Sequence, residues 1–158
     1  MSNLDIVIPI FNEGNNLSLL INKIRETVKI PHKILICYDN DDESGLKFLP
    51  KYKNVIPVKN NGLGPNEAIK TGFMFCSSDV ILVYMSDDFE NLDLINKMYY
   101  LIKNKNYDFV IPSRYVENGK FINAKLYKKI ITNIGAFLIH NICGIPFKDC
   151  TNAFKMFK

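Results

Sequence analysis

Short apolar runs alternate along the chain with stretches in which apolar residues recur every three or four positions. Residues 4–10 are almost wholly apolar, as expected of a strand that is buried on both faces of a sheet. The next segment has the spacing of one helix face, with apolar side chains at Leu17, Leu20, Ile21, Ile24 and Val28. Pro31 closes this predicted helix, because proline cannot continue the backbone hydrogen bonding of a helix.

The same alternation continues as far as residue 142. Further strands are predicted at residues 33–38, 55–58, 80–85 and 109–111, and further helices at residues 66–76, 92–102 and 125–142. Strands that alternate with helices are typical of right-handed crossover connections. The sequence therefore predicts an α/β fold, with a mainly parallel sheet and helices on both faces. Since no linker or internal repeat divides the chain, a single domain over residues 1–158 is expected.

Composition and charge narrow the class of protein. The 158 residues are 47% apolar and 23% charged, the balance of a soluble globular protein rather than a disordered one. The formal net charge of +4 is too small to indicate a nucleic-acid partner, and none is expected. A mildly basic surface suits a phosphorylated substrate or an anionic membrane surface equally well.

The cysteines and the amino terminus bear on the cellular compartment. Cys37, Cys76, Cys143 and Cys150 form no CxxC pair and have apolar neighbours, so buried and reduced thiols are expected. The first residues show no basic region ahead of an apolar one and no small-residue cleavage site. Both features predict a cytoplasmic protein.

One long segment near the carboxyl terminus lacks charge. Residues 130–147 contain no formally charged side chain and approach the length of a membrane-spanning helix. Asn133, His140, Asn141 and Pro146 interrupt the segment, and such groups are costly in hydrocarbon. We therefore expect a buried or interfacial helix, with membrane-surface association through residues 125–143, at the cytoplasmic face.

Polar and charged residues follow four of the predicted strands. These loops are residues 11–13, 39–43, 86–90 and 113–115. In open α/β sheets, ligands bind at the carboxyl ends of the strands, and parallel strands bring these ends to one edge. The four loops are therefore predicted to contribute to one ligand site.

The acids after the fourth predicted strand suit a divalent metal ion. Mg²⁺ and Mn²⁺ prefer carboxylate oxygens and are often shared with substrate phosphates, so Asp87, Asp88 and Glu90 are the predicted ligands. The alternative is that Asp87 and Asp88 only cap the helix that starts near Leu92. The preceding buried strand and Arg114 after the next strand favour the metal site.

Three other features have two interpretations each. Asp39 either accepts hydrogen bonds from a nucleotide base or ribose, or belongs to a solvated turn. The glycine loop at residues 61–68 either directs amides at phosphate or lets backbone pass close to a ligand or a strand. Arg114 either binds phosphate or forms a surface salt bridge.

Several short motifs, in order along the chain, resemble those of family 2 glycosyltransferases. Residues 7–13 resemble the opening strand of that family, which ends in Pro-x-Tyr/Phe-Asn-Glu, and Asp39 stands where the family has an Asp that contacts the nucleotide base. The remaining matches are the glycine-alanine-glycine helix entry at Gly62, Gly64, Ala68 and Gly72, the Ser-Arg-Tyr segment at residues 113–115 and the Asp-x-Thr-x-x-Phe-Arg-x-Phe signature at residues 149–157. The most similar branch is that of the polyprenyl-phosphate (dolichol-phosphate) mannosyl- and glucosyltransferases.

This resemblance implies a fold, a set of site residues and a reaction. The fold is the nucleotide-diphospho-sugar transferase (GT-A) fold. Asp88, Arg114 and Asp149 are the implied catalytic residues, and Asp87, Asp88 and Glu90 the implied ligands of Mg²⁺ or Mn²⁺. The implied nucleotide-sugar-binding residues are Pro9, Phe11, Asn12, Glu13, Asp39, Gly64, Ser86, Asp87 and Lys128.

The implied reaction is inverting transfer of a sugar from a nucleotide-diphosphate sugar to a lipid-phosphate or glycan acceptor. A lipid phosphate is already anionic, whereas a hydroxyl acceptor needs a base, for which Asp149 is the candidate. The part of the protein that binds the acceptor would then lie beyond Lys158, so that residues 1–158 are a fragment.

Ser86 departs from the pattern of the branch, which has the first Asp of an Asp-x-Asp motif at this position. Either Asp87 compensates for the missing carboxylate, or the affinity for metal is low. The alternative function is a catalytically weak or inactive domain of the same fold that binds nucleotide or a partner protein. A nucleotidyltransferase is less favoured, because no glycine-rich loop follows the first strand.

Overall fold

A computed structural model describes residues 3–116 and 126–158, except for the side chains of Lys128 and Lys129. The chain divides into two compact units, one formed by Met1–Val110 with Phe154–Lys158 and the other by Ile111–Ala153. The expectation of a single domain over residues 1–158 stays a prediction. We refer to the two parts as the sheet unit and the helix unit.

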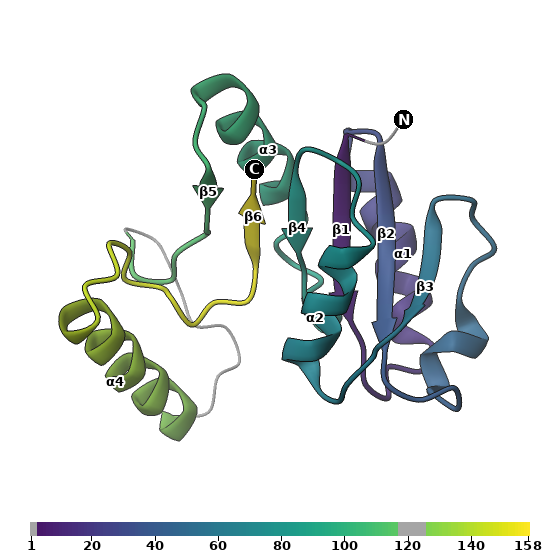
Figure 1. Cartoon of the computed structure of the whole chain (residues 1–158), viewed down its shortest axis with the longest axis horizontal. Helices are drawn as coiled ribbons and strands as arrows, with labels where there is room; N and C mark the ends of the chain where they lie inside the picture. Colours follow the sequence, from purple (N-terminus) through teal and green to yellow (C-terminus); the bar gives the residue numbers. More distant parts are fainter. Residues whose placement is uncertain (1–2, 117–125) are drawn as a thin grey trace. The chain divides into compact units, whose positions relative to one another are not determined.

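The sheet unit is built on six strands in the order β3-β2-β1-β4-β6-β5 (Figure 1). The strands are β1 (Leu4–Pro9), β2 (His32–Tyr38), β3 (Val55–Lys59), β4 (Ile81–Val83), β5 (Phe109–Val110) and β6 (Lys155–Phe157). The first four form parallel pairs, whereas β6 runs antiparallel to both β4 and β5. The expected mainly parallel α/β sheet is confirmed.

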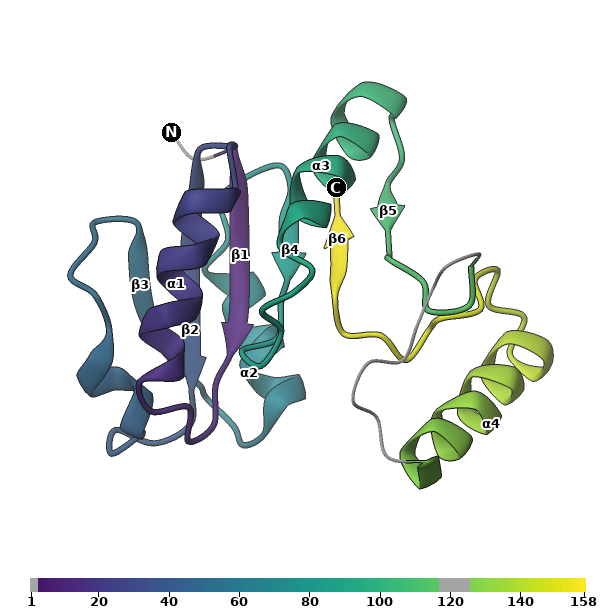
Figure 2. The same cartoon turned by 180° about the vertical axis from the view of Figure 1, so that it is seen from behind.

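Helices cover both faces of this sheet. Figure 1 shows α2 (Pro65–Met74) in front of the sheet, and Figure 2 shows α1 (Asn16–Thr27) and α3 (Asp93–Lys105) in front of the opposite face. A short 3-10 helix, η1 (Ser44–Phe48), follows β2.

Alternate residues of β1 belong to two separate hydrophobic cores of the sheet unit. Ile6 and Ile8 of β1 belong to the larger core, which includes the buried faces of α1 and α3. Val7 belongs to a smaller core with Ala68 of α2. A strand buried on both faces reads as a continuous apolar run, which explains the composition of residues 4–10.

Helix α2 lies very close to the sheet at one glycine. A Cβ atom on Gly72 would lie 2.4 Å from Cγ1 of Val7 and 2.9 Å from Sγ of Cys37. Both distances are shorter than a van der Waals contact. Gly72 therefore lets the α2 backbone pack directly on β1 and β2.

Two elements of the sheet unit were not predicted from the sequence. Strand β6 has three residues, of mixed polarity, and is defined by its pairing with β4 and β5. Helix η1 lies in the polar segment that follows β2. Periodicity cannot detect elements this short, because they contain less than two full repeats.

The helix unit contains α4 (Leu126–Ile142), most of whose described apolar side chains are exposed. The expectation of a buried helix is therefore wrong, and the interfacial alternative stays a prediction. Among the residues described, no helix has the length and apolar character needed to cross the membrane.

None of the four cysteines, all of which lie in the described part of the chain, forms a disulfide bond, as expected, but they are not all buried. Cys37 is buried, Cys76 and Cys150 are partly buried, and Cys143 is exposed. Burial raises the pKa of Cys37 to about 12, so this thiol stays protonated and unreactive at neutral pH. The prediction of burial is wrong for Cys143, because its apolar neighbours on α4 are exposed themselves.

Candidate nucleotide-sugar site

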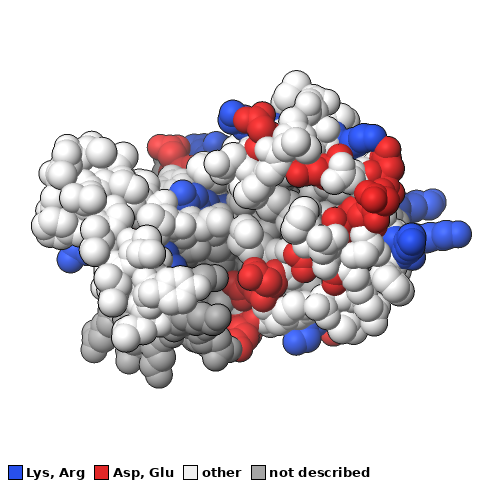
Figure 3. All heavy atoms as spheres, turned by 90° about the horizontal axis from the view of Figure 1, so that it is seen from below, with Lys and Arg blue, Asp and Glu red and all other residues white. Residues whose placement is uncertain are grey.

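The carboxyl ends of the parallel strands β1 to β4 meet at one edge of the sheet unit, the lower edge in Figure 1. Figure 3 looks at the molecule from this side and shows several Asp and Glu side chains (red) there. Four loops were predicted to meet at one edge; three of them follow β1, β2 and β4, whereas the fourth, at residues 113–115, belongs to the helix unit, so its part in the same site stays a prediction. The hydrogen bonds described below join the first three loops.

A buried carboxylate, Glu43, fixes the loop that follows β1. Its Oε2 accepts a hydrogen bond from the amide of Asn12 at 2.8 Å, and its Oε1 accepts one from the amide of Glu13 at 3.2 Å. Oε1 also accepts from the amide of Gly45 at 3.2 Å, within Glu43's own loop. Asn12 and Gly14 have positive φ angles of 57° and 54°, which this network holds in place. The loop is therefore a defined turn.

Sequence reasoning did not identify Glu43. It is the last acid of the run at residues 39–43, and nothing in the sequence separates it from Asp41 and Asp42, which are exposed. The one local signal was the Ser-Gly pair at residues 44 and 45, which indicates a turn directly after Glu43. In the structure, Oγ of Ser44 accepts a hydrogen bond from the amide of Gly14 at 3.1 Å.

Ser86 connects the end of β4 to the loop after β1. Its hydroxyl donates to Oε1 of Glu13 across 2.5 Å, and Ser86 itself is buried. This serine stands where the resemblance led us to expect a metal-binding carboxylate. A carboxylate at this position would face the Glu13 carboxylate and repel it, whereas the serine hydroxyl donates a hydrogen bond to it.

Asp39 anchors the glycine loop that precedes α2. Its Oδ2 accepts from the amide of Gly64 at 2.8 Å, and its Oδ1 accepts from Nδ2 of Asn60 at 2.8 Å. Asn60 is buried and accepts a hydrogen bond from Thr71 of α2 at 2.9 Å. Gly64 has a φ of 86°, which favours glycine. Asp39 is thus hydrogen-bonded within an ordered loop and does not belong to a solvated turn. Its contact with a nucleotide base or ribose stays a prediction.

Asp88 forms the turn that leads into α3. Its Oδ1 accepts hydrogen bonds from the amides of Glu90 and Asn91 at 3.1 and 3.2 Å and from Nδ2 of Asn91 at 3.0 Å. Its Oδ2 accepts from Nδ2 of Asn91 at 2.9 Å, and the Tyr84 hydroxyl also interacts with the Asp88 carboxylate. These bonds form a turn ahead of α3, whose N-cap is Leu92 and receives no side-chain hydrogen bond, so the alternative that Asp87 and Asp88 only cap this helix is wrong. Asp87 and Glu90 are exposed.

The predicted metal ligands do not form a ready-made cluster. Within the described part of the chain, no group of three or more His, Cys, Asp or Glu side chains is arranged to hold a metal ion. Mg²⁺, however, usually keeps several water ligands and binds through one or two carboxylates together with substrate phosphates. Asp88 with one exposed neighbouring carboxylate supplies a donor set of that kind.

Tyr84 is a polar group at this edge that sequence reasoning missed. The side chain is buried, and its ring packs edge-on against Phe154 with centroids 4.9 Å apart. Its hydroxyl lies near the Asp88 carboxylate but forms no hydrogen bond of good geometry to any described residue. Burial raises the pKa of the phenol well above its ordinary value, and the charge of Asp88, the interaction of the hydroxyl with the Asp88 carboxylate and the charge of Asp87 raise it further. The hydroxyl therefore remains a protonated donor. The sequence shows only an aromatic residue at the end of an apolar run.

Two of the predicted catalytic residues form an ion pair in the helix unit. The Arg114 guanidinium lies against Asp149 in a bidentate arrangement, with Nε 2.9 Å from Oδ2 and Nη2 2.5 Å from Oδ1, and Nη2 also donates to Thr151 at 3.1 Å. The amide of Arg114 donates to Oδ2 of Asp149 as well, at 2.8 Å. This hydrogen bonding to Asp149 raises the pKa of Arg114 above its ordinary value.

The ion pair defines what Asp149 can do. Its side chain is buried and both oxygens accept hydrogen bonds from Arg114, so protonation of Asp149 would remove the negative charge that holds the guanidinium. Tyr115 has its pKa raised, first by burial and then by the charge of Asp149. The prediction that Arg114 binds phosphate is untested, as is that of Asp149 as a base.

The remaining predicted site residues differ in how well they can be placed. Pro9 is the buried last residue of β1, and the Phe11 side chain is 71% exposed beside the turn held by Glu43. The side chain of Lys128 lies outside the described residues. Its role in binding the nucleotide sugar stays a prediction.

Comparison with known proteins identifies the family. The model of the family described as Glycosyl transferase family 2 matches residues 5–158. The chain belongs to glycosyl transferase family 2. Two curated relatives are a dolichol-phosphate mannosyltransferase of Pyrococcus furiosus, 29% identical over 149 residues, and the poly(ribitol-phosphate) beta-N-acetylglucosaminyltransferase TarP of Staphylococcus aureus, 25% identical over 137 residues. These matches cover 91% and 82% of this chain but 42% of each relative.

Solved structures have the same fold. The chain superposes on residues 1–349 of S. aureus TarS with a TM-score of 0.67 and 15% identity, covering 100% of this chain and 47% of that one. Glucosyl-3-phosphoglycerate synthase from Mycobacterium tuberculosis, in complex with Mn²⁺, UDP-glucose and phosphoglyceric acid, gives a TM-score of 0.69 at 13% identity, with coverage of 99% and 56%. The GT-A fold and the family predicted from the sequence are confirmed.

Proposed function

We propose that this chain is the nucleotide-sugar-binding part of a glycosyltransferase that transfers a sugar from a nucleotide-diphosphate donor. The observation that carries the proposal is the junction of three loops at the carboxyl edge of the sheet. Glu43 and Ser86 tie the loops after β2 and β4 to the loop after β1, and Asp39 holds the glycine loop before α2. In an open α/β sheet this edge is where ligands bind.

The donor's nucleoside is proposed to contact the loops after β1 and β2. The exposed ring of Phe11 offers a surface on which a base can stack, while Pro9, Asn12 and Glu13 shape the turn beneath it. Each oxygen of Asp39 accepts one hydrogen bond within the protein and can accept another from a base or ribose. Gly64 lets the backbone approach the ligand closely.

A divalent cation, Mg²⁺ or Mn²⁺, is proposed to bind through Oδ2 of Asp88 with help from Asp87 or Glu90. When bound, such a cation supplies Lewis-acid stabilisation of the charge on the leaving diphosphate. Asn91 holds the Asp88 carboxylate in a fixed orientation by two hydrogen bonds. Ser86 donates a hydrogen bond to Glu13. This position therefore makes a structural contact where related motifs have a metal ligand.

Arg114 and Lys128 are proposed to supply positive charge to substrate phosphates. Asp149 keeps the planar guanidinium of Arg114 in one orientation, which makes it a positioning residue for that group. With a lipid-phosphate acceptor no base is required, because the attacking oxygen is already anionic. We therefore favour an inverting transfer to a polyprenyl phosphate, which is consistent with the similarity to a dolichol-phosphate mannosyltransferase.

Helix α4 is proposed to lie on an anionic membrane surface at the cytoplasmic face. Its apolar side chains at Leu126, Ile131, Ile134, Leu138 and Ile142 are exposed. The sequence from residue 118 to residue 148 contains five lysines and no Asp or Glu. Exposed apolar side chains together with nearby lysines favour binding at the interface of a bilayer with anionic lipids.

The test is a transfer assay with the whole chain and the common nucleotide-diphosphate sugars. A thermal-shift screen first selects the donor that raises the melting temperature most, and labelled donor is then incubated with Mn²⁺ and a short polyprenyl phosphate. We expect a labelled lipid product with inverted anomeric configuration. Donor binding without any transfer or donor hydrolysis would instead identify a nucleotide-binding domain without turnover.

A further inference from the structure

Asp39 lies directly after β2 and is held by a chain of hydrogen bonds that begins inside α2. The hydroxyl of Thr71 lies 2.9 Å from Oδ1 of Asn60, and Nδ2 of Asn60 lies 2.8 Å from Oδ1 of Asp39. The amide of Gly64 donates to the other oxygen, Oδ2, at 2.8 Å. Thr71 and Asn60 are buried, whereas Asp39 is partly exposed. Donors from α2 and from the loop after β3 are thus linked to one carboxylate at the end of β2.

The partners of Asn60 determine which way its side-chain amide points. Its Oδ1 accepts from the hydroxyl of Thr71 and, at 3.2 Å, from the backbone amide of Gly62. A backbone N–H can only donate, so the side-chain atom that faces Gly62 must be the oxygen. The NH₂ group of Asn60 therefore faces Asp39. The opposite orientation would place the Asn60 oxygen against the carboxylate, where two acceptors repel each other.

These hydrogen bonds prepare Asp39 to accept from a ligand. One donor at each oxygen, from Asn60 and Gly64, fixes the plane of the carboxylate. Each oxygen keeps at least one further acceptor site, and the side chain is partly exposed. A ligand bound here has to present an N–H or O–H group, because an ionised carboxylate only accepts.

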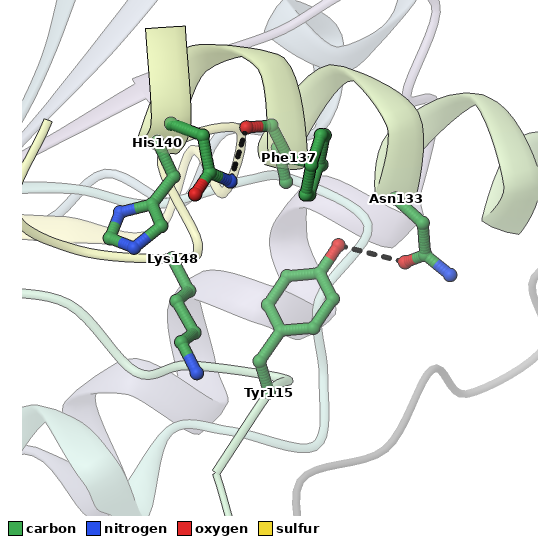
Figure 4. A pocket seen from close by; sticks show the side chains of 7 residues that line it. Tyr115, Asn133, Phe137, His140 and Lys148 are labelled. Atoms are coloured by element: carbon green, nitrogen blue, oxygen red, sulfur yellow. Dashed lines mark hydrogen bonds between the residues drawn. The ribbon is translucent and has the colours of Figure 1, made fainter. Parts of the chain in front are cut away.

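The cavity of the helix unit has a different arrangement of polar groups. It has a volume of about 430 Å³, and Tyr115, Asn133 and Lys148 are among the residues that line it. The Tyr115 hydroxyl donates to Asn133 at 2.9 Å, whereas the ammonium group of Lys148 points away from that pair (Figure 4). These groups do not converge on one point, as the donors around Asp39 do.

We propose that Asn60, oriented by Thr71, is a positioning residue through which Asp39 selects nucleotides by a hydrogen-bond donor. The donor that Asp39 recognises is an N–H group of the base or a hydroxyl of the ribose. Asn60 acts through Asp39 and does not itself contact the nucleotide. This inference rests on the proposed function, in which Asp39 contacts the base or ribose. Neither Asn60 nor Thr71 was predicted as a site residue from the sequence.

The test is calorimetric titration of the whole chain, at a fixed Mn²⁺ concentration, with UDP, GDP and analogues of both. N3-methyl-UDP and N1-methyl-GDP lack the base N–H, and the 2′-deoxy and 3′-deoxy forms each lack one ribose hydroxyl. The measured quantity is the discrimination ratio, the affinity for the nucleotide divided by the affinity for its analogue. For the unmodified chain we expect a ratio of about tenfold or more with one class of analogue, because a hydrogen bond to a charged group is lost.

Four variants separate positioning from a merely structural role. Asn60→Ala removes the donor to Asp39, Thr71→Val removes the hydroxyl that orients Asn60, and Thr71→Ser keeps that hydroxyl. Asn104→Ala, at an exposed asparagine of α3, is the control. We expect Asn60→Ala to reduce the ratio to below about threefold and Thr71→Val to reduce it by about half or more. Thr71→Ser and Asn104→Ala should keep the ratio of the unmodified chain.

The outcomes separate the source of the donor from the proposal itself. Discrimination against the methylated analogues identifies a base N–H, and discrimination against the deoxy analogues identifies a ribose hydroxyl; either supports the inference. Weaker binding of nucleotide and analogue alike, with an unchanged ratio, would overturn it and leave the proposed function standing, as would a ratio of one in the unmodified chain. If Asn60→Ala does not fold, the comparison of Thr71→Val with Thr71→Ser decides. No binding of either diphosphate by the unmodified chain would refute the proposed function and this inference with it.

Discussion

The hydroxyl of Ser86 lies 2.5 Å from Oε1 of Glu13 and joins the end of β4 to the turn after β1. Related motifs have a carboxylate where Ser86 stands. The structure gives this position a different task, because a hydroxyl can donate to Glu13 and a carboxylate cannot. The hydrogen bond between Ser86 and Glu13 is therefore a structural reason for a serine in place of the first Asp of the Asp-x-Asp pattern.

Replacement of Ser86 tests this relationship. In metal-free buffer, Ser86→Ala should lower the free energy of unfolding by about 1 kcal/mol, because one hydrogen bond is lost. Ser86→Asp should lower it by about 3 kcal/mol, because a buried carboxylate then faces Glu13. Urea unfolding measures both. If Ser86→Asp were the more stable variant and bound Mn²⁺ more tightly than the unmodified chain, the natural protein would be an attenuated enzyme.

Glu43 should matter for nucleotide binding without touching the nucleotide. Glu43→Gln turns an acceptor into an amide donor opposite the amides of Asn12 and Glu13, so the turn after β1 loses at least one hydrogen bond. We expect a loss of about 1–3 kcal/mol in unfolding free energy and weaker nucleoside diphosphate binding. Asp42→Asn, at an exposed acid beside it, should change neither. Equal effects of the two variants would mean that the turn does not depend on Glu43.

A divalent cation and a nucleoside diphosphate should stabilise the protein together more than either does alone. A ligand that binds only the folded state raises stability according to its concentration relative to its dissociation constant. Asp39→Ala should weaken nucleoside and nucleoside diphosphate binding alike, whereas Asp88→Ala should weaken only the metal-dependent part. Thermal shifts with and without Mn²⁺ measure this. Identical profiles for the two variants would argue against separate roles.

The Arg114–Asp149 pair should behave as a unit. Asp149→Asn leaves the guanidinium without its charged partner and should cost about 3 kcal/mol of unfolding free energy, as for other buried pairs that lose one member. Arg114→Lys loses the bidentate geometry, and the double variant should cost less than the sum of the single ones. Additive losses would show that the two side chains act independently. If Asp149→Asn kept stability but abolished transfer to a hydroxyl acceptor, Asp149 would be a base.

Tyr84→Phe should not destabilise the protein. The hydroxyl is buried near Asp88 but forms no hydrogen bond of good geometry to the described residues, so its removal takes away a poorly satisfied donor and leaves the packing against Phe154 intact. We expect an unchanged melting temperature or a gain of up to about 1 kcal/mol. Tyr100→Phe, at an exposed tyrosine, is the control. A loss above about 1 kcal/mol would show that the Tyr84 hydroxyl has a stabilising partner, for which the Asp88 carboxylate is the candidate.

The sequence by itself determined the order of most elements and the edge of the sheet where the site lies. The apolar run at residues 4–10 and the helical spacing from Leu17 to Val28 are local patterns with several repeats, so they predict elements reliably. The polar loops after β1, β2 and β4 meet because parallel strands share an edge, which follows from the fold class.

Only the tertiary structure decided what the individual side chains do. The use of Glu43 rather than its neighbours, the pairing of Ser86 with Glu13 and the bond from Asp39 to Gly64 all join residues 25 or more positions apart. The same holds for β6, which is a strand only because β4 and β5 lie on either side of it. Such contacts depend on distance in space, burial and hydrogen-bond geometry, and none of these leaves a periodic signal along the chain.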